Sequence, residues 1–543
     1  MHKKMKILLL AIYSEGMRTV YEEMGICSIA ALLRKNKYDV MLMGKKEEEI
    51  DYDKIETFSP DLIGMTMYNS SQKAVYRASE RLKQLLPETY ICVGGTLPTY
   101  YHTELLKEAP AIDMVIRGEG EFAMLNLASC LEMKNDLSTI DGLTYRLNDN
   151  IVANRDREPI KDLDLLPAPA RDLLVQNNIK IAQISTSRGC MGKCTFCASQ
   201  LFWKKWRGRS AKNIADEIEH IIKTYKIDAF YFIDGSFEDP DEGCSRLIEI
   251  AENILERNLK IYYFANFRAE FVRKSTPKVM ELLVKSGLCG VCIGLEGANE
   301  SDMILYGKSA NLEDNFKVIE LFQEYDINIE PGFINLNPYS TFEGIRKNID
   351  FLSKYKFLAN KAILLNRYNM MKNTALYRKI VKDNLLKEGD FDECGYHFVD
   401  SRIEKLVDFI TDYVFSIDDK LNNAINKISY YGNDFMTLLA YLKRRISEDN
   451  NAILQSIIAE FDNINKENLT KANRIFAEWY HELLNLAENN WDETAGRAIS
   501  DRKLKNNELI EIANEIDKSK NRMYIRLIRS SPKYSDYFLK IVN

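Results

Sequence analysis

The stretch Gly189-Cys190-Met191-Gly192-Lys193-Cys194-Thr195-Phe196-Cys197 places three cysteines within eight residues, at the spacing CxxxCxxC. A structural zinc ion takes four protein ligands, so this stretch would have to recruit a distant one such as His220. A disulfide would leave one thiol over. In a cubane iron-sulfur cluster, each iron needs one ligand besides its sulfides, and three thiolates leave one iron open. We therefore expect Cys190, Cys194 and Cys197 to hold a cluster with an open iron.

The cysteine motif follows the first strand of a repeated strand-helix pattern. Candidate strands start about every 30 residues, the length of a βα unit, at 181–185, 229–233, 261–267, 291–295, 327–334 and 362–367. Six such units predict an incomplete parallel (β/α)6 barrel, in which chemistry lies at the carboxyl ends of the strands. The cysteines lie at the first of these ends.

A second alternation of strands and helices precedes the barrel. Short apolar runs at 7–13, 38–43, 62–67, 90–93 and 114–116 are separated by segments with helical spacing. This pattern predicts a doubly wound, Rossmann-like parallel sheet, which binds ligands beyond the carboxyl ends of its strands. Those ends carry Tyr13-Ser14, Thr66-Met67-Tyr68-Asn69, Gly94-Gly95-Thr96 and Gly118-Glu119-Gly120. Tight βα turns alone would also explain the glycines.

The whole chain is thus predicted to be an α/β protein with four parts. Residues 1–140 form the sheet domain, and 141–180 form a connector with a hairpin at 142–153. Residues 181–385 form the barrel. From 386 to 543 the strand signal fades and long helical periodicities indicate an all-helical domain.

Composition excludes several classes of function. The 543 residues carry a net charge of -6, so no basic field attracts nucleic acid or an anionic membrane. The apolar run at 7–13 is too short for a signal peptide or a membrane span. Ten cysteines in so long a chain are too few for a disulfide scaffold. We expect a cytoplasmic protein.

The cysteine motif, with Phe196 directly before its last cysteine, resembles the signature of radical S-adenosylmethionine (SAM) enzymes. Trp206-Arg-Gly-Arg-Ser210 is similar to the segment that opens the first barrel helix in one branch of that family. That branch, which includes the class B methyltransferases, carries an N-terminal cobalamin-binding domain, and its marks resemble Val93-Gly-Gly-Thr96, Arg117-Gly-Glu-Gly-Glu121 and Leu166-Pro-Ala-Pro-Ala-Arg171. The resemblance covers residues 5–385.

The resemblance implies that the cysteines hold a [4Fe-4S] cluster whose open iron binds the amino and carboxylate groups of SAM. Reductive cleavage of SAM would then give methionine and a 5′-deoxyadenosyl radical. Further contacts to cluster or SAM are implied for Phe196, Asp234, Asn266, Arg268, Glu296 and Ile334. Asp234 departs from the usual pair of acids, because Gly235 takes the second place.

For cobalamin, the resemblance implies contacts from the strand ends of the first domain. The candidates are Tyr13, Ser14, Thr66, Met67, Tyr68, Asn69, Gly94, Gly95, Thr96, Gly118, Glu119 and Gly120. Tyr68 is a candidate to face the cobalt. The first domain has only His2 and His102, neither in a DxHxxG motif, so we expect a lower cobalt face without a histidine ligand. The alternative is a vestigial, empty domain.

The leading hypothesis is a cobalamin-dependent radical SAM methyltransferase that methylates an unactivated carbon of a small-molecule or peptide substrate. An external flavodoxin- or ferredoxin-like protein would supply electrons. A second hypothesis keeps both cofactors but replaces methylation with radical cyclisation or ring rearrangement. A third is a noncatalytic cluster- or cobalamin-binding module.

Overall fold

The computed structural model describes residues 4–13, 21–148, 150–238, 240, 243–387, 395–448, 451–505 and 507–531. Ser14, a candidate cobalamin contact, lies outside this range. The chain divides into two compact units. The first comprises Met1–Met191, Ala198–Gly235 and Glu256–Leu259, and the second comprises Gly192–Cys197, Ser236–Leu255 and Lys260–Asn543. The cysteine motif is therefore shared, with Cys190 in the first unit and Cys194 and Cys197 in the second.

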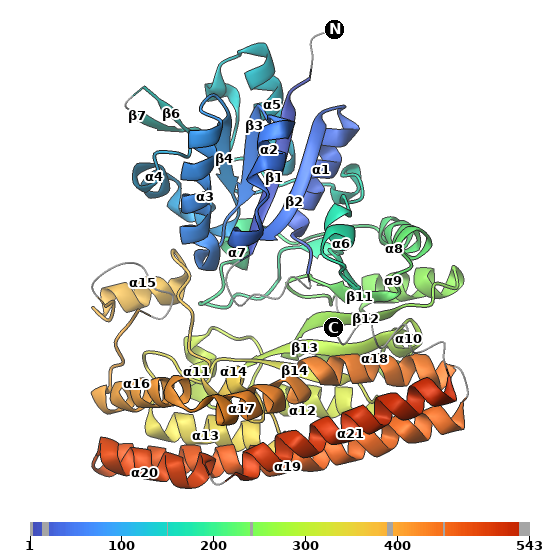
Figure 1. Ribbon diagram of the computed structural model, residues 1–543, viewed down its shortest axis with the longest axis vertical. Helices are drawn as coiled ribbons and strands as arrows, with labels where there is room; N and C mark the ends of the chain where they lie inside the picture. The colour runs from blue at the N-terminus through green and yellow to red at the C-terminus, as the bar shows by residue number, and fades with distance from the viewer. Residues whose placement is uncertain are drawn as a thin grey trace. The chain divides into compact units, whose positions relative to one another are not determined.

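A seven-stranded sheet forms the centre of the first unit, in the order β2-β1-β3-β4-β5-β6-β7 (Figure 1, blue to teal). Its first five strands are parallel and confirm the five predicted ones: β1 Lys6–Tyr13, β2 Asp39–Lys46, β3 Leu62–Thr66, β4 Tyr90–Gly94 and β5 Met114–Ile116. The predicted hairpin, β6 Leu143–Leu147 and β7 Asn150–Ala153, is also present and extends this sheet in antiparallel pairing.

Helices cover both faces of this sheet, as a doubly wound fold requires. Alternate residues of a strand point to opposite faces, and β1 divides accordingly. Ile7 and Leu9 pack with α1 (Met24–Lys35) and α5 (Glu121–Met133). Leu8 and Leu10 pack with α2, α3 and α4 in the other core, and these helices span Tyr52–Phe58, Gln72–Leu85 and Thr96–Glu108. Burial on both faces explains the unbroken apolar run at the start of the chain.

The remainder of the first unit leads into the cysteine motif. After the short helix α6 (Asp172–Gln176), β8 (Ile181–Ile184) pairs in parallel with β11 (Ala229–Phe232). A two-stranded ribbon of β9 (Ser187–Arg188) and β10 (Arg207–Gly208) lies directly beside the motif in sequence. The helices between these strands are α7 Ser199–Trp203 and α8 Ala211–Tyr225.

The strand-helix alternation continues in the second unit. β12 (Tyr262–Arg268), β13 (Leu288–Glu296) and β14 (Asn328–Phe333) pair in parallel. The accompanying helices are α9 Ser245–Glu256, α10 Pro277–Lys285, α11 Glu300–Leu305, α12 Leu312–Glu324 and α13 Phe342–Lys354. The prediction of a strand at 362–367 was wrong. The helix α14 (Lys361–Leu364) lies in this segment, and only Arg367 forms a parallel bridge, to Leu336.

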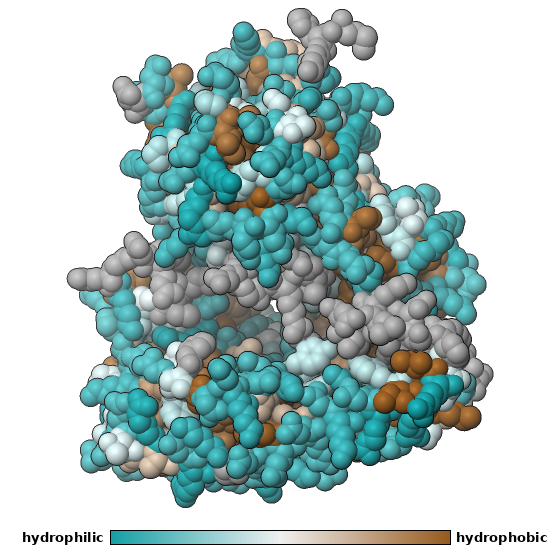
Figure 2. Space-filling view, in the orientation of Figure 1, coloured by the Kyte–Doolittle hydropathy of each residue, from teal (hydrophilic) through white to brown (hydrophobic). Residues whose placement is uncertain are grey.

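Helices dominate the described chain after α14, with one isolated antiparallel bridge between Leu386 and Tyr396. The helices are α15 Ala375–Lys382, α16 Ser401–Ser416, α17 Asp419–Gly432, α18 Asp434–Glu448, α19 Ala452–Asn489, α20 Glu493–Leu504 and α21 Glu508–Ser530 (Figure 1, yellow to red). On the face shown in Figure 2, the surface of α19 to α21 is mostly hydrophilic. Among the described helices, none is long and apolar enough to cross a membrane.

Candidate functional site

The first half of the cysteine loop fits tightly into the first unit. Gly189 has a φ of +91°, and a Cβ on it would lie 2.7 Å from the carbonyl oxygen of Lys205. Cys190 is half-buried, and its Cβ lies 3.4 Å from the position that a Cβ on Gly235 would take. Glycine at position 189 therefore lets the loop pass closely along Lys205, whereas at position 235 a Cβ would make only an ordinary contact with Cys190.

Asp234 anchors the segment that leads into this loop. Its carboxylate is buried and accepts hydrogen bonds from Thr186 Oγ1 at 2.8 Å, from Ser187 Oγ at 2.9 Å and from the Ser187 amide. These donors stabilise the ionised carboxylate. The structure thus assigns Asp234 contacts within the protein, whereas a contact to SAM stays a prediction.

A buried network of ion pairs surrounds the β9-β10 ribbon. Arg188 NH1 lies 2.6 Å from Glu119 Oε1, and Arg188 NH2 pairs with Glu121. Arg207 NH1 lies 2.8 Å from Glu119 Oε2, which also accepts the Ile160 amide at 2.7 Å. Burial opposes the ionisation of Glu121, but Arg188 outweighs it and holds the pKa of that carboxyl below its usual value. Glu119, predicted to contact cobalamin, is already engaged by three partners from the protein.

Neutral contacts hold the second half of the loop in the second unit. The Thr195 amide donates to the Tyr306 carbonyl at 2.9 Å, and Thr195 Oγ1 donates to the Leu305 carbonyl at 2.6 Å. The Leu376 amide donates to the Thr195 carbonyl at 2.9 Å. Phe196 packs edge-on against the Tyr306 ring, with centroids 5.5 Å apart. This ring contact helps to orient the loop, and a contact of Phe196 to the cluster or SAM stays a prediction.

The donor chemistry of the loop fits an iron-sulfur cluster. Cys190 and Cys194 are half-buried, Cys197 is exposed, and none of the three is in a disulfide. Within the described ranges, no three cysteine, histidine or acidic side chains are gathered into a ready metal site. The loop therefore supplies three thiols of the right kind, whose sulfurs would come together on binding the cluster.

A buried polar cluster behind Tyr306 was not predicted from the sequence. Asp302 is buried and accepts amide hydrogen bonds from Asn299 at 2.6 Å, Asn337 at 2.8 Å and Asn348 at 3.1 Å. Asn337 also donates to the Tyr306 hydroxyl at 2.9 Å. Burial raises the pKa of Asp302, and the three amides oppose this. The cluster fixes α11, whose end carries the carbonyls that bind Thr195.

Glu296 ends β13 in an unusual backbone conformation. Its φ is +66°, a left-handed value that places the residue beside a register shift between β13 and β14. Burial raises the pKa of Glu296, while the nearby Lys308 ammonium lowers it. Lys308 Nζ donates to the Gly294 carbonyl at 2.9 Å. A buried carboxyl with a raised pKa and a left-handed backbone at a strand end is typical of a binding site, and Lys308 is a neighbour that sequence reasoning missed.

The other barrel candidates lie at the ends of β12 and β14. Arg268 Nε donates to Glu238 Oε1 at 2.8 Å, and its NH1 lies 3.7 Å from Glu270. The predicted carboxylate capture by Arg268 would thus compete with two acids of the protein. Asn266 accepts the Phe237 amide through its backbone carbonyl at 2.8 Å. Ile334 is buried and donates its amide to Glu296 at 2.9 Å, so its apolar side chain belongs to the core.

The carboxyl edge of the first sheet has the close backbone approach expected of a cofactor site. Gly95 has a φ of +115°, and a Cβ there would lie 2.9 Å from the Met67 carbonyl oxygen. Gly95 also caps α4, and the amides of Thr96 and Leu97 in its first turn can bind an anionic group such as a phosphate, whereas Pro98 has no amide hydrogen and the Thr99 amide donates to the Gly95 carbonyl. Gly118 has a φ of +76° and open space where a Cβ would lie. These residues fit a bound nucleotide tail.

The side chains of the other cobalamin candidates differ in exposure. Met67 is fully buried in the core, whereas the Tyr68 ring is 37% exposed and its hydroxyl donates to Glu23 at 2.8 Å. Tyr13 is buried at the end of β1, with its hydroxyl against Gly44. The remaining candidates Thr66, Asn69, Gly94 and Gly120 are partly exposed at the strand ends. Tyr68 is the candidate ring best placed to meet a ligand at this edge.

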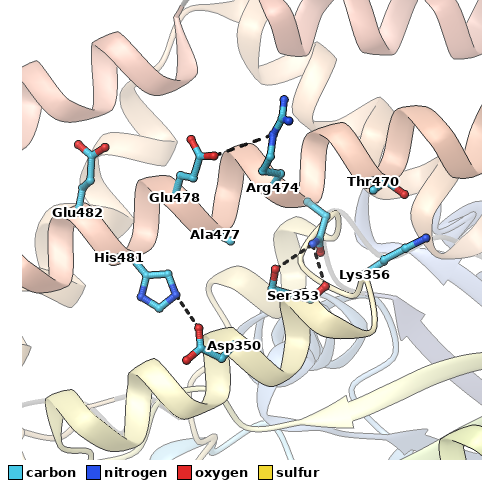
Figure 3. Close-up of a pocket in the computed structure, with 10 residues that line it drawn as sticks. Asp350, Ser353, Lys356, Thr470, Arg474, Ala477, Glu478, His481 and Glu482 are labelled. Carbon is cyan, nitrogen blue, oxygen red and sulfur yellow. Dashed lines mark hydrogen bonds and ion pairs between the residues drawn. The ribbon is translucent and has the colours of Figure 1, made fainter.

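A separate cavity of 580 Å³ lies in the second unit between α13 and α19. Figure 3 shows His481 facing Asp350, with 2.9 Å between Nε2 and Oδ1, and Arg474 paired with Glu478. Charges of both signs line this cavity and neutralise each other. None of its lining residues is a cysteine or ends a strand, so it lies outside the candidate site.

Two family models match the chain. Residues 16–128 match the B12 binding domain, and residues 184–352 match the radical SAM superfamily. The two matches together confirm the resemblance on which the sequence interpretation rests.

Curated relatives and a solved structure are similar to the chain over more than half of its length. An anaerobic magnesium-protoporphyrin IX monomethyl ester cyclase of Rubrivivax gelatinosus is 29% identical over 327 residues, which are 57% of this chain and 58% of the cyclase. An uncharacterized methyltransferase of Pyrococcus horikoshii is 27% identical over 399 residues, 71% of this chain and 85% of that protein. The cobalamin-dependent SAM radical enzyme OxsB, with aqua-cobalamin and SAM bound, has the same fold, with a TM-score of 0.69 at 17% identity over 97% of this chain and 80% of OxsB.

Proposed function

We propose, from the premise that the chain is a cobalamin-dependent radical SAM enzyme, that it transfers a methyl group to an unactivated carbon of its substrate. The observation that supports methyl transfer is the extent of the match to the Pyrococcus horikoshii methyltransferase, which covers 85% of that protein. The Rubrivivax gelatinosus cyclase is matched over only 58% of its length. Part of this cyclase therefore lies outside the match.

The bound groups would supply a radical and a transferable methyl group, which protein side chains alone cannot provide. Cys190, Cys194 and Cys197 would hold the [4Fe-4S] cluster. Glu296 and Lys308 at the end of β13 would offer one negative and one positive charge to a zwitterion such as SAM. Gly95 and the start of α4 would receive the nucleotide tail of cobalamin.

A second candidate function, radical cyclisation or rearrangement, is favoured by the identity of 29% to the cyclase. It would use the same cluster and the same SAM contacts, because both reactions begin with removal of a hydrogen atom. The two functions differ in the fate of the SAM methyl group, and this difference decides the experiment.

The test is an anaerobic assay of the reconstituted protein with cobalamin, methyl-deuterated SAM and a strong chemical reductant. S-adenosylhomocysteine formed alongside 5′-deoxyadenosine, both measured by mass spectrometry, is the expected result. 5′-Deoxyadenosine alone would contradict methyl transfer and favour rearrangement. Binding of both cofactors with neither product would instead favour a noncatalytic module.

The same proposal includes a small-molecule or peptide substrate and a protein electron donor of the flavodoxin or ferredoxin type. It also places the chain in a reducing cytoplasm. Ten cysteines in 543 residues are too few for a disulfide scaffold, which supports a reducing compartment. Replacing the chemical reductant with reduced flavodoxin should sustain SAM cleavage if the donor assignment is right.

A further inference from the structure

Two carboxylates follow β5, Glu119 in the loop and Glu121 at the first position of α5, and both contact Arg188, the residue directly before Gly189-Cys190. Arg188 spans them, with NH1 at 2.6 Å from Glu119 and NH2 on Glu121. Arg207 lies opposite Arg188 in the β9-β10 ribbon and reaches the second oxygen of Glu119 at 2.8 Å. We call Glu119, Glu121, Arg188 and Arg207 the clamp.

The clamp is buried, and its charges are matched. The exposed fractions of the side chains are 4% for both glutamates, 13% for Arg188 and 10% for Arg207. A charge held away from water is costly unless it is paired and hydrogen-bonded, so each guanidinium is confined to the position where it meets its carboxylate. Arg188 spans both acids with separate nitrogens, which fixes the direction of its fork as well as its distance.

Further contacts complete the surroundings of the clamp. Ser28 Oγ donates to Glu121 at 2.8 Å, and the Ile160 amide donates to Glu119 at 2.7 Å. The Trp203 ring lies 5.3 Å from the Arg188 guanidinium, within the range of a cation-π contact. The clamp therefore has partners on several sides and holds Arg188 in one place.

The backbone transmits this position to the first cysteine. Arg188 is followed directly by Gly189, which passes against Lys205, and then by Cys190, which lies against Gly235. Gly189 has no side chain to hold it, so its neighbours must define the path of the turn. The Arg188 side chain is the buried anchor nearest to Cys190 on its N-terminal side.

We propose that Glu119 and Glu121 are positioning residues for Cys190, acting through Arg188, and that Arg207 supports Glu119. This inference rests on the proposed function in that Cys190 is taken as a cluster ligand. It gives the acidic Arg117-Gly-Glu-Gly-Glu121 segment a role at the cysteine loop, in addition to the ligand contacts predicted for Gly118, Glu119 and Gly120. Partners behind a metal ligand commonly govern both affinity and electronic properties of the metal group.

The first experiment uses the full-length apoprotein. Cysteine alkylation by iodoacetamide is followed at each site by mass spectrometry in Glu119→Gln, Glu121→Gln, their double variant and Arg188→Gln. The expected result is a rise of about 10-fold in the alkylation rate at Cys190 for the double variant. The rate at Cys197, which lies in the other unit, should stay within about twofold and serves as the internal reference.

The matched control is Arg34→Gln, which breaks another ion pair of the first unit. Arg34 binds Asp172 through two nitrogens at 2.8 and 2.9 Å, without contact to the β9-β10 ribbon. Its alkylation profile should equal that of the unchanged protein. Equal rates at Cys190 in the clamp variants and in the control would overturn the proposal.

The second experiment uses protein reconstituted anaerobically with iron and sulfide. The clamp variants should bind less iron per chain, and their reduced clusters should give an altered electron paramagnetic resonance spectrum. Arg188→Lys keeps the charge but cannot span two acids. Compared with Arg188→Gln, it should bind more iron per chain but still give an altered spectrum. Unchanged spectra in all clamp variants would contradict the proposal.

The two experiments separate the clamp from the proposed function. If the unchanged protein binds no cluster, the proposed function fails, while alkylation of the apoprotein still tests the clamp. If Arg188→Gln does not fold, as thermal melting would reveal, Glu121→Asp retains the charge and withdraws it by one methylene. It should raise the Cys190 rate in the same direction by about threefold, and no rise would count against the clamp.

Discussion

The two halves of the cysteine loop are held by different physical means. Gly189-Cys190 is held in the first unit by buried charges and by close packing against Gly235. Thr195-Phe196 is held in the second unit by backbone hydrogen bonds and the Tyr306 ring. Ion pairs weaken when one partner is neutralised by mutation or by acid, whereas neutral hydrogen bonds weaken mainly when the donor and acceptor move apart. One metal-binding motif thus has two mechanically distinct supports.

Removing a thiol should give the largest loss of activity, and the loss should be equal for the two halves of the loop. Cys190→Ala and Cys194→Ala are each expected to reduce SAM cleavage to the background, because either variant leaves only two thiolates for the cluster. Cleavage is measured as 5′-deoxyadenosine after anaerobic reconstitution. Cys289→Ala is the control, since this buried thiol donates to the Tyr263 carbonyl and lies outside the loop. Retained cleavage in Cys194→Ala would refute the cluster assignment.

Replacing one glycine beside each half should reveal unequal tolerance. Gly189→Ala combines a φ of +91° with a Cβ 2.7 Å from a backbone oxygen, and we expect a loss of about 2 to 3 kcal/mol in the free energy of unfolding. Gly307→Ala has a φ of +61°, and its Cβ would lie 3.0 Å from Thr195 Cγ2, a tight contact but one longer than that at Gly189, so about 1 to 2 kcal/mol is expected. Urea unfolding measures both. Equal losses of unfolding free energy in the two variants would show that the backbone is packed no more tightly around Gly189 than around Gly307.

Substitutions at Gly235 separate size from charge next to Cys190. In Gly235→Ala the new Cβ would lie 3.4 Å or more from its neighbours, an ordinary contact, so iron content should stay near that of the unchanged protein. Gly235→Asp would place a second carboxylate beside the thiolate and disfavour the anionic sulfur. We expect about tenfold weaker cluster retention, measured as iron lost to a chelator over time. A normal Gly235→Asp cluster would contradict this account.

The smallest expected effect is the response of the clamp to acid. Burial opposes ionisation of Glu121, but Arg188 lowers its pKa overall. A carboxyl with a lowered pKa stabilises the fold above its unfolded-state pKa and loses this contribution as the pH falls through the folded-state value. As the pH falls from about 5, just above the unfolded-state pKa, to about 3, the unchanged protein should therefore lose about 1 kcal/mol more unfolding free energy than Glu121→Gln. Parallel losses in urea titrations would contradict the assignment.

Most of the strand pattern could be predicted because apolar runs in parallel sheets are buried on both faces. The failure at 362–367 has a local cause. Ala362-Ile-Leu-Leu365 is apolar and too short to distinguish strand from helix by periodicity. The Asn360 side chain accepts the Ala362 amide at 2.9 Å and starts α14 instead. This capping residue was the available signal.

The candidate site was predictable in its cysteines but not in its charge partners. The spacing of the cysteines reflects the chemistry of the cluster directly. Glu119 and Arg188 are separated by 69 residues, so no local pattern could pair them. Lys308 and Glu238 were missed because no local sequence pattern pairs Lys308 with Gly294 or Glu238 with Arg268.

Cys197 is the exposed member of the three thiols. An accessible thiol oxidises in steps from sulfenic to sulfinic and sulfonic acid, and the later steps are not reversed by ordinary reductants. Protein handled in air before the cluster is assembled should therefore carry its first irreversible damage at Cys197. The yield of cluster reconstitution would then fall with the time that the protein had spent in air. Peptide mapping of oxidised Cys197 would measure the extent of this damage.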